Sequence, residues 1–294
     1  MGILDGRRIA ALRQEKLKER VKALRARGVI PTIAPILIRG NPAGEVYYKS
    51  KKNLSRELGI GFQGVILPKE TNEVELIDTI HRLNADPTVH GIFLELPLPA
   101  QIPLPAVGRE IAPEKDIDAI NPVNLGRLIL GGTRDATYAE LKARPDLLLP
   151  ATPQGVMELL LAAGVELAGK EVVIVGGGTV GLSLSLLILR QGYGDVTLCE
   201  YQGKDLREIV PRGDVVCACA GRPNLITPEM VKEGAVVIDI GINVTEKGIC
   251  GDVDFEAAKE KASLITPVPG GVGPMTTTMI MENTVKAAEN LSAG

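Results

Sequence analysis

Residues 171–200, EVVIVGGGTVGLSLSLLILRQGYGDVTLCE, decide the fold of this chain. They begin with an apolar, β-branched run at 172–175, which predicts a strand buried on both faces of a parallel sheet. The loop GGGTVG at 176–181 matches G-x-G-x-x-G, and the apolar segment 182–189 after it has the length of a helix. A second predicted strand at 196–199 ends directly before an acid. This order is typical of a Rossmann-type parallel sheet that binds a dinucleotide.

The glycine loop and the acid have separate tasks in binding a nucleotide. Gly176 permits the tight turn, Gly178 lets the backbone approach a pyrophosphate, and Gly181 lets the helix pack closely on the strand. Free N–H groups and the positive dipole at the start of the helix favour phosphate. Glu200 can accept both hydroxyls of an adenosine ribose and would repel a 2′-phosphate. The loop residues expected at the coenzyme are Gly176, Gly177, Gly178, Thr179, Val180 and Gly181.

The composition excludes several classes of protein. With 294 residues, 45% of them hydrophobic, the chain can bury a core in each of two domains. A net charge of −3 gives no signal for nucleic acid, and no apolar run approaches the roughly 18 residues of a membrane helix. Three arginines, Arg7, Arg8 and Arg13, interrupt the N-terminus before a signal segment forms, so we expect a cytoplasmic protein.

Cysteine and histidine are too few for most metal or triad chemistry. The four cysteines form no C-x-x-C pair, and we expect reduced thiols in or beside core strands. The two histidines, His81 and His90, leave no material for a histidine-based metal site or a Ser-His triad, so no metal is predicted. Acid–base work is expected from Lys, Asp, Glu or Tyr.

The first half of the chain alternates predicted helices and strands, which implies a parallel sheet with right-handed crossovers. Helices are expected at 5–27, 45–58 and 73–83, and strands at 33–38, 64–67 and 91–94. Ligands bind beyond the carboxyl ends of such strands, which selects Tyr47, Lys51, Glu95 and Asp118 as one site. Tyr47 and Lys51 are four residues apart and share a helix face.

The second half begins with an irregular, polar segment at 131–150, which we expect to be a linker or surface loop with an insertion at about 133–146. A helix at 152–163 and strands at 215–219, 236–240 and 264–266 are predicted to complete the second sheet. The run TPVPGGVGPMT at 266–276 is rich in proline and glycine and predicts a rigid loop that lines a ligand site. A closing helix to about residue 291 follows.

The order of motifs resembles the methylenetetrahydrofolate dehydrogenase/methenyltetrahydrofolate cyclohydrolase family. The run PGGVGPMT at 269–276 is highly specific to that family. The other matching pieces span nearly the whole chain: ILDG at 3–6, Y-x-x-x-K at 47–51, VHGIFLELPLP at 89–99, APEKDID at 112–118, DIGIN at 239–243, GDV at 251–253 and the strand that leads into 269–276.

The resemblance implies an α/β protein of two domains. A three-layer α/β catalytic domain is expected at 1–149, with the C-terminal helix at 275–294 returning to it, and a Rossmann-type nucleotide domain at 150–274. The folate would lie in the cleft between the domains of each subunit of a homodimer. The implied activity is oxidation of 5,10-methylenetetrahydrofolate by hydride transfer to NAD(P), with hydrolysis of the product to 10-formyltetrahydrofolate.

The resemblance also implies roles for individual residues. Tyr47 would stack on the folate, Lys51 would be the catalytic lysine, and Asp118 would hold the pterin, because one carboxylate can accept the two adjacent N–H donors of its edge. The backbone at Ile242 would lie beside the nicotinamide. The remaining residues of the folate site would be Glu95, Leu96, Pro97, Pro269, Gly270, Gly271, Val272 and Gly273.

The chemistry of the two steps makes Glu95 the most important departure from the family pattern, which usually has Gln there. Hydride removal leaves a cation spread over two folate nitrogens and depends mainly on positioning. Water addition needs proton transfer, and a carboxylate beside Lys51 favours the ammonium form. We therefore expect hydrolysis to be weakened or lost, or Glu95 itself to act as the base.

Further departures concern the coenzyme and the start of one helix. The nucleotide loop is one residue shorter than the family's Gly-Arg-Ser-x-x-Val-Gly and lacks its arginine, which together with Glu200 favours NAD over NADP. Arg207 or Lys204 could still meet a 2′-phosphate. Gly44 replaces a serine and is expected to loosen the helix start. The competing hypotheses are another two-domain amino-acid or hydroxy-acid dehydrogenase, a non-catalytic folate- or nucleotide-binding protein, and a glycine turn without a ligand.

Overall fold

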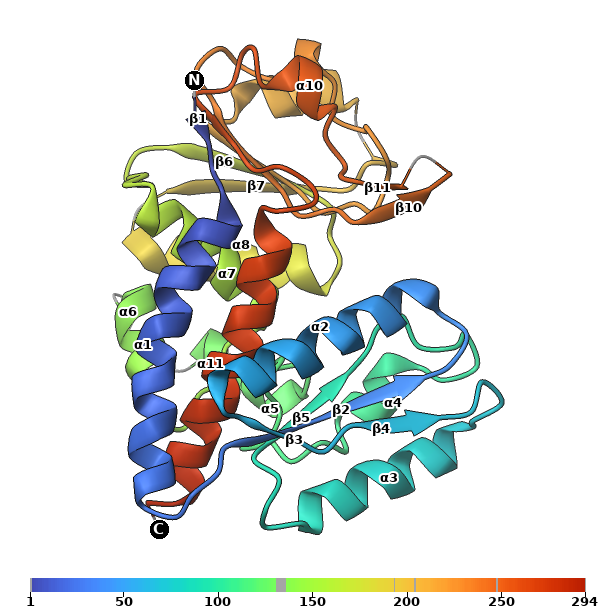
Figure 1. Ribbon diagram of the computed structural model, residues 1–294. Helices are drawn as coiled ribbons and strands as arrows, with labels where there is room; N and C mark the ends of the chain where they lie inside the picture. The colour runs from blue at the N-terminus through green and yellow to red at the C-terminus, as the bar shows by residue number, and fades with distance from the viewer. Residues whose placement is uncertain (1, 131–135, 193, 204, 247, 294) are drawn as a thin grey trace. The chain divides into compact units, whose positions relative to one another are not determined.

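The computed structural model describes residues 2–130, 136–192, 194–203, 205–246 and 248–293 (Figure 1). The chain divides into two compact units. The six-stranded unit contains residues 1–11, 132–141 and 152–276, and the four-stranded unit contains residues 12–131, 142–151 and 277–294. Each unit has a parallel sheet of its own, so the expected α/β class is confirmed.

The six-stranded sheet is parallel throughout, with strand order β1-β12-β9-β8-β6-β7. Its strands are β1 (Gly2–Ile3), β6 (Glu171–Val175), β7 (Asp195–Cys199), β8 (Val215–Ala218), β9 (Val236–Asp239) and β12 (Leu264–Ile265). The chain moves from β6 to β7 in one direction and places β8 on the other side of β6. This reversal makes the β6/β8 boundary the topological switch point, where ligands of such sheets bind.

The central strands of this sheet are buried because helices and loops cover both faces. Val173, Val175, Val216 and Val237 belong to one apolar core and have no exposed surface, as expected for strands of a parallel sheet. The covering elements of the unit are α7 (Ala151–Ala162), α8 (Thr179–Gly192), α9 (Leu206–Ile209), α10 (Phe255–Ala258) and the 3₁₀ turns Val210–Arg212 and Pro228–Met230. A hairpin of β10 (Asn243–Thr245) and β11 (Gly248–Cys250), which the sequence patterns do not predict, follows β9.

The four-stranded sheet is built on β2 (Thr32–Ile38). The strands β3 (Gly61–Phe62) and β4 (Val65–Leu67) pair in succession along one edge of β2, and β5 (Gly91–Leu94) pairs along the other, all of them parallel. The carboxyl ends of β2 and β5 therefore lie next to each other. The flanking helices are α2 (Pro42–Leu58), α3 (Glu73–Ala85), α4 (Leu104–Gly108) and α5 (Pro122–Leu130).

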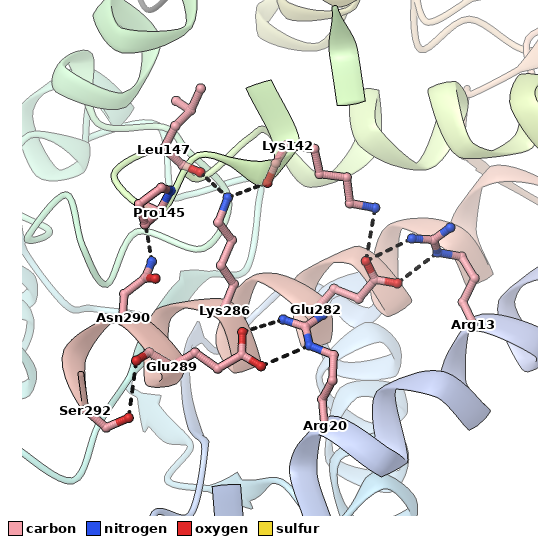
Figure 2. Close-up of polar contacts among 10 residues, drawn as sticks. All are labelled: Arg13, Arg20, Lys142, Pro145, Leu147, Glu282, Lys286, Glu289, Asn290 and Ser292. Atoms are coloured by element: carbon pink, nitrogen blue, oxygen red, sulfur yellow. Dashed lines mark hydrogen bonds and ion pairs between the residues drawn. The ribbon is translucent and has the colours of Figure 1, made fainter. Parts of the chain in front are cut away.

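Polar contacts fix α11 (Val272–Leu291) to α1 (Gly6–Ala26) and to residues 142–149 within the four-stranded unit (Figure 2). The Glu282 carboxylate forms ion pairs with Arg13 at 2.8 Å and Lys142 at 3.2 Å, although the Glu282 side chain is only 9% exposed. Lys286 donates to the backbone carbonyls of Lys142 and Leu147 at 2.7 Å each, and its burial lowers its pKa to about 8. Because Glu282 and Lys286 are buried with polar partners, removal of one partner is expected to lower the free energy of unfolding.

The segment predicted to be a linker at 131–150 is partly helical. Residues 131–135 lie outside the described residues, but α6 (Tyr138–Ala143) follows them. Thr137 and Glu140 form a capping box, in which each side chain accepts the backbone N–H of the other residue. Tyr138 is 1% exposed, and its hydroxyl donates to Glu158 at 2.8 Å. The prediction of a plain surface loop was wrong because this T-x-x-E signal and the buried tyrosine were overlooked.

Two helix starts also differ from the prediction. α2 begins at Pro42, and the Asn41 side chain accepts the Gly44 N–H at 3.4 Å, so a cap is present even without the serine. α11 begins at Val272, which shortens the predicted 266–276 loop to its first half. The start of α1 packs closely against the loop before α11. This approach requires glycine at position 6, because a Cβ there would overlap the Gly271 carbonyl.

Candidate active site

The glycine loop lies at the carboxyl end of β6, beside the switch point. Gly176 has φ of 120° and donates to the Cys199 carbonyl at 2.8 Å, a conformation that favours glycine. A Cβ at Gly181 would overlap the Gly176 carbonyl, whereas a Cβ at Gly178 would meet no atom within 4 Å. The loop is therefore closed where the helix packs and open above Gly178. A diphosphate fits this arrangement, because α8 begins at Thr179 and presents its N-terminus there.

Glu200 is exposed at the tip of β7 and contacts the glycine loop. Its Oε1 accepts the Gly177 N–H at 3.0 Å. A side chain at position 177 would press against this carboxylate, because a Cβ there would lie 2.5 Å from Oε1. The lack of a side chain at Gly177 leaves room for the Glu200 carboxylate, and the hydrogen bond from the Gly177 N–H holds that carboxylate beside the loop.

Two buried carboxylates shape the loops after β8 and β9. Asp252 accepts the N–H groups of residues 220–222 at 2.6–2.9 Å and the Asn243 amide at 2.8 Å. Asp239 accepts the N–H groups of Gly241, Asp252 and Val253, and burial raises its pKa to about 7. Ile242, which the sequence analysis expected beside the nicotinamide, lies between these anchors and is 41% exposed. Neither aspartate is predicted as an anchor by a local sequence pattern, because each binds backbone N–H groups on other loops.

Lys51 and Glu95 form a buried ion pair in the four-stranded unit. Lys51 Nζ lies 2.9 Å from Glu95 Oε2, and each side chain is only 4% exposed. Nζ also lies 4.4 Å from the centroid of the Phe93 ring and 5.8 Å from that of Tyr47. Tyr47 and Lys51 share a face of α2, as their spacing predicts. Phe93 was missed, although the two-residue period of a strand places it on the same face as Glu95.

The Glu95 carboxylate is not fully satisfied by Lys51. Burial raises the pKa of Glu95, and the nearby lysine opposes that shift. Its second oxygen, Oε1, is buried and has no hydrogen-bond partner among the described residues. An acceptor of this kind is costly unless a ligand, water or proton completes it. The site therefore contains an acceptor that is suited to a bound donor or a proton.

Asp118 lies within electrostatic range of this pair. Burial first, and the charge of Asp116 second, raise its pKa to about 7. The Asp118 carboxylate accepts the Ala151 N–H at 3.3 Å, while Asp116 is fully buried and accepts the Asn121 N–H at 2.8 Å. Ala119, which directly follows Asp118, has a φ of 52°, a backbone conformation that costs energy for a residue other than glycine. The four predicted residues Tyr47, Lys51, Glu95 and Asp118 are thus brought together.

The other predicted folate residues fall in two places. Leu96 and Pro97 follow Glu95 and are exposed, and the peptide bond between them is cis. Residues 269–273 belong to the six-stranded unit, where Gly270 accepts the Arg7 N–H at 3.2 Å and Gly271 donates to Pro267 at 2.7 Å. Pro269 is exposed, Gly270, Gly271 and Val272 are buried, and Gly273 is half-buried in the first turn of α11.

Two family profiles match the chain. The profile described as tetrahydrofolate dehydrogenase/cyclohydrolase, catalytic domain, matches residues 4–118, and that of the NAD(P)-binding domain matches residues 150–292. The chain belongs to the tetrahydrofolate dehydrogenase/cyclohydrolase family. This membership decides against the alternative of an unrelated two-domain amino-acid or hydroxy-acid dehydrogenase.

Members of this family resemble the chain over its full length. The "Bifunctional protein FolD 2" of Geobacter metallireducens is 46% identical over 294 residues, covering 99% of this chain and 98% of its own. The bifunctional methylenetetrahydrofolate dehydrogenase/cyclohydrolase structure from Campylobacter jejuni is 41% identical, with a TM-score of 0.90 and 99% coverage of both chains. The Trypanosoma brucei FolD structure, complexed with NADP and an inhibitor, is 34% identical, with a TM-score of 0.89 and coverage of 99% and 98%.

Membrane-spanning helices and metal-binding clusters are both absent from the described parts of this family member. Across those residues, no helix is long and apolar enough to cross a membrane. The same residues contain no group of three or more His, Cys, Asp or Glu side chains placed to hold a metal ion. The four cysteines are free thiols, of which Cys217 is buried.

Proposed function

We propose that this chain oxidises 5,10-methylenetetrahydrofolate to 5,10-methenyltetrahydrofolate and hydrolyses that product to 10-formyltetrahydrofolate. The observation that carries the proposal is the Lys51, Glu95 and Asp118 group in a member of this family. NAD(P), which supplies the hydride acceptor, would be held by residues 176–181 and Glu200, with Ile242 beside its nicotinamide. We assign the folate chemistry to the four-stranded unit and coenzyme binding to the six-stranded unit. The units differ from the expected domains at 1–149 with 275–294 and at 150–274, because residues 1–11 and 132–141 belong to the six-stranded unit.

Asp118 is the proposed anchor for the pterin. A 2-aminopyrimidinone edge presents two adjacent N–H donors, and an ionised carboxylate can accept both. Because the pKa of Asp118 is raised to about 7, most molecules have the ionised carboxylate, which can accept both donors, only above neutral pH. Tyr47 would provide a stacking face. Leu96 and Pro97 would line the rest of the folate within the four-stranded unit, and the role of residues 269–273 stays a prediction from the family resemblance.

Hydride removal depends on holding the folate in position. Loss of the hydride leaves a positive charge shared by two folate nitrogens. The Lys51–Glu95 pair carries no net charge when both groups are ionised, so it does not oppose that cation as a lone ammonium would. The first reaction therefore needs no further proton transfer from these residues.

Hydrolysis needs a group that takes a proton from the attacking water. Lys51 Nζ is held 2.9 Å from Glu95 as the cation of an ion pair, and an ammonium group cannot accept that proton. We infer that the hydrolytic step is weaker than the dehydrogenase step. A dehydrogenase-only enzyme is the second candidate, and the same ion pair favours it. A third mechanism uses Glu95 Oε1, which has no hydrogen-bond partner in the described chain, as the base.

NAD is the proposed coenzyme in preference to NADP. The support is Glu200, whose carboxylate is held against the Gly177 N–H where a ribose 2′-phosphate would be repelled. Arg207 lies in α9, and Lys204, the other candidate for a 2′-phosphate, lies outside the described residues. A homodimer in the cytoplasm remains a prediction from the family resemblance and the composition.

The proposal is tested with purified protein, methylenetetrahydrofolate and either NAD or NADP, with reduced coenzyme and the methenyl product followed as separate absorbances. Methenyl product that accumulates in step with reduced coenzyme indicates a dehydrogenase with weak hydrolysis. Reduced coenzyme without methenyl product indicates two full activities and contradicts the inferred effect of Glu95. Absence of a signal with both coenzymes would favour a non-catalytic binding protein. Faster turnover with NADP would overturn the coenzyme preference.

A further inference from the structure

Two side chains that the proposed mechanism leaves without a role meet at the carboxyl edge of the six-stranded sheet. Tyr201 follows Glu200 after β7, and Arg222 lies on the loop after β8. The guanidinium carbon of Arg222 lies 4.9 Å from the centroid of the Tyr201 ring, and its Nη2 donates to the Tyr201 hydroxyl at 2.6 Å. Because β6 lies between β7 and β8, this contact passes beside the end of β6, where the glycine loop begins.

The backbone that carries Arg222 is held by a buried carboxylate. Asp252 has no exposed surface and accepts the N–H groups of Ala220, Gly221 and Arg222. A Cβ at Gly241 would overlap this carboxylate, so the glycine is needed for the arrangement. Four donors fix Asp252, while the Arg222 side chain is exposed. The backbone of the loop is thus held by hydrogen bonds, while the exposed arginine side chain is free to meet a ligand.

The Tyr201 hydroxyl determines where the guanidinium points. It accepts Arg222 at 2.6 Å and the Gln202 amide at 2.7 Å. The guanidinium therefore lies over the Tyr201 ring, which directly follows Glu200 in the chain, and its phenol partner is not a carboxylate that would form an ion pair with it. A guanidinium plane stacks well on a nucleobase and also pairs readily with phosphate. Which of these it does depends on whether its orientation is fixed.

We propose that Tyr201 and Arg222 form the adenine side of the coenzyme site, where adenine stacks on the Arg222 guanidinium and the Tyr201 hydroxyl holds that group away from a ribose 2′-phosphate. The inference rests on the proposed nucleotide function and adds two specificity-determining residues to it. Dinucleotides bind at the switch point of such sheets, and the pair spans the loops on either side of β6. Glu200 would then read the ribose hydroxyls, while Arg222 contributes to adenine binding without favouring NADP.

The first test compares Arg222→Ala and Arg222→Lys with wild type. Dissociation constants for ADP-ribose and NAD are measured calorimetrically on the full chain. Loss of the guanidinium plane should weaken both ligands about tenfold in either variant, because lysine restores the charge but not the plane. Arg212→Ala is the matched control, since Arg212 is an exposed arginine of the same unit that pairs with Glu171 at the opposite, amino end of β6. The control should bind both ligands as wild type does.

The second test uses Tyr201→Phe, which keeps the ring and removes the hydroxyl. Release of the guanidinium should raise the ratio of NADP affinity to NAD affinity about tenfold. An unchanged ratio of NADP to NAD affinity would overturn the role of Tyr201. ADP-ribose binding that is insensitive to Arg222→Ala, or restored by Arg222→Lys, would overturn stacking while the nucleotide function stands. Failure of wild type to bind NAD, NADP and ADP-ribose would overturn the proposed function and this inference together.

Discussion

Replacement of Glu95 by glutamine should separate the two activities of the chain. The substitution removes the carboxylate charge 2.9 Å from Lys51 Nζ and keeps a side chain of the same shape. Coulomb's law gives about 6 kcal/mol for this attraction at an effective dielectric constant of about 20. Desolvation of both groups offsets much of that energy. If about a quarter of it survives as net stabilisation of the ion pair, its loss in the variant corresponds to a factor of about ten.

The expected result is hydrolysis about tenfold faster in Glu95→Gln, with little change in coenzyme reduction. Hydrolysis is measured on preformed methenyltetrahydrofolate by the decay of its absorbance, after subtraction of the spontaneous rate. The dehydrogenase rate is measured on the same preparation. Glu282→Gln is the matched control, because it also removes one buried carboxylate from an ion pair with Arg13 and Lys142. Per folded molecule, this control should hydrolyse at the wild-type rate.

Two results would refute this reasoning about the ion pair. A fall in hydrolysis of about a hundredfold or more, with coenzyme reduction retained, would identify Glu95 as the general base. A variant that hydrolyses at the wild-type rate would show that the Glu95 charge does not control the lysine. The sign of the change therefore distinguishes between the mechanisms.

Three further predictions concern a binding group, a buried cation and a glycine. Asp118→Asn should raise the KM for folate about tenfold and abolish its increase below about pH 7, where wild type protonates this carboxyl; a KM that stays pH-dependent in the variant would contradict the assignment. The free energy of unfolding of wild type relative to Lys286→Met should rise from pH 8 to 10, by at most about 1.4 kcal/mol per pH unit, because the folded protein releases the Lys286 proton first. Denaturant titrations at several pH values check this, and a flat difference contradicts it. Gly251→Ala should destabilise the protein by about 3 kcal/mol or more in a thermal melt, because its Cβ would overlap the Asp239 carboxylate; an unchanged melting temperature would show that the loop relaxes freely.

The sequence by itself determined the elements whose signals are local. The β-branched run at 172–175 coincides with β6, and the predicted strands at 196–199 and 91–94 coincide with β7 and β5 to within one residue. β5 and four of the five residues of β6 are buried, as their apolar composition predicts, whereas β7 is an edge strand with exposed and half-buried residues. The contact between Tyr47 and Lys51 was equally predictable, because helix geometry fixes neighbours four residues apart.

Short elements were harder to predict because their local signals are weak. The capping box of α6 spans only Thr137 and Glu140, and β1 has two residues whose partner strand begins at Leu264. Neither element has enough residues for a clear hydrophobic period. Their formation depends on contacts with distant parts of the chain, such as that between Tyr138 and Glu158.

Only the tertiary structure decided which charges meet. Lys51 and Glu95 are 44 residues apart, and Asp252 binds N–H groups 30–32 residues before it. Periodicity places each side chain on a face but does not specify its partner on another element. The raised pKa of Asp118 follows from burial first and from the charge of Asp116 second, and burial exists only after the sheet and helices have packed. The residue types at the site can be read from the sequence, whereas their protonation and pairing depend on desolvation and distance in the folded chain.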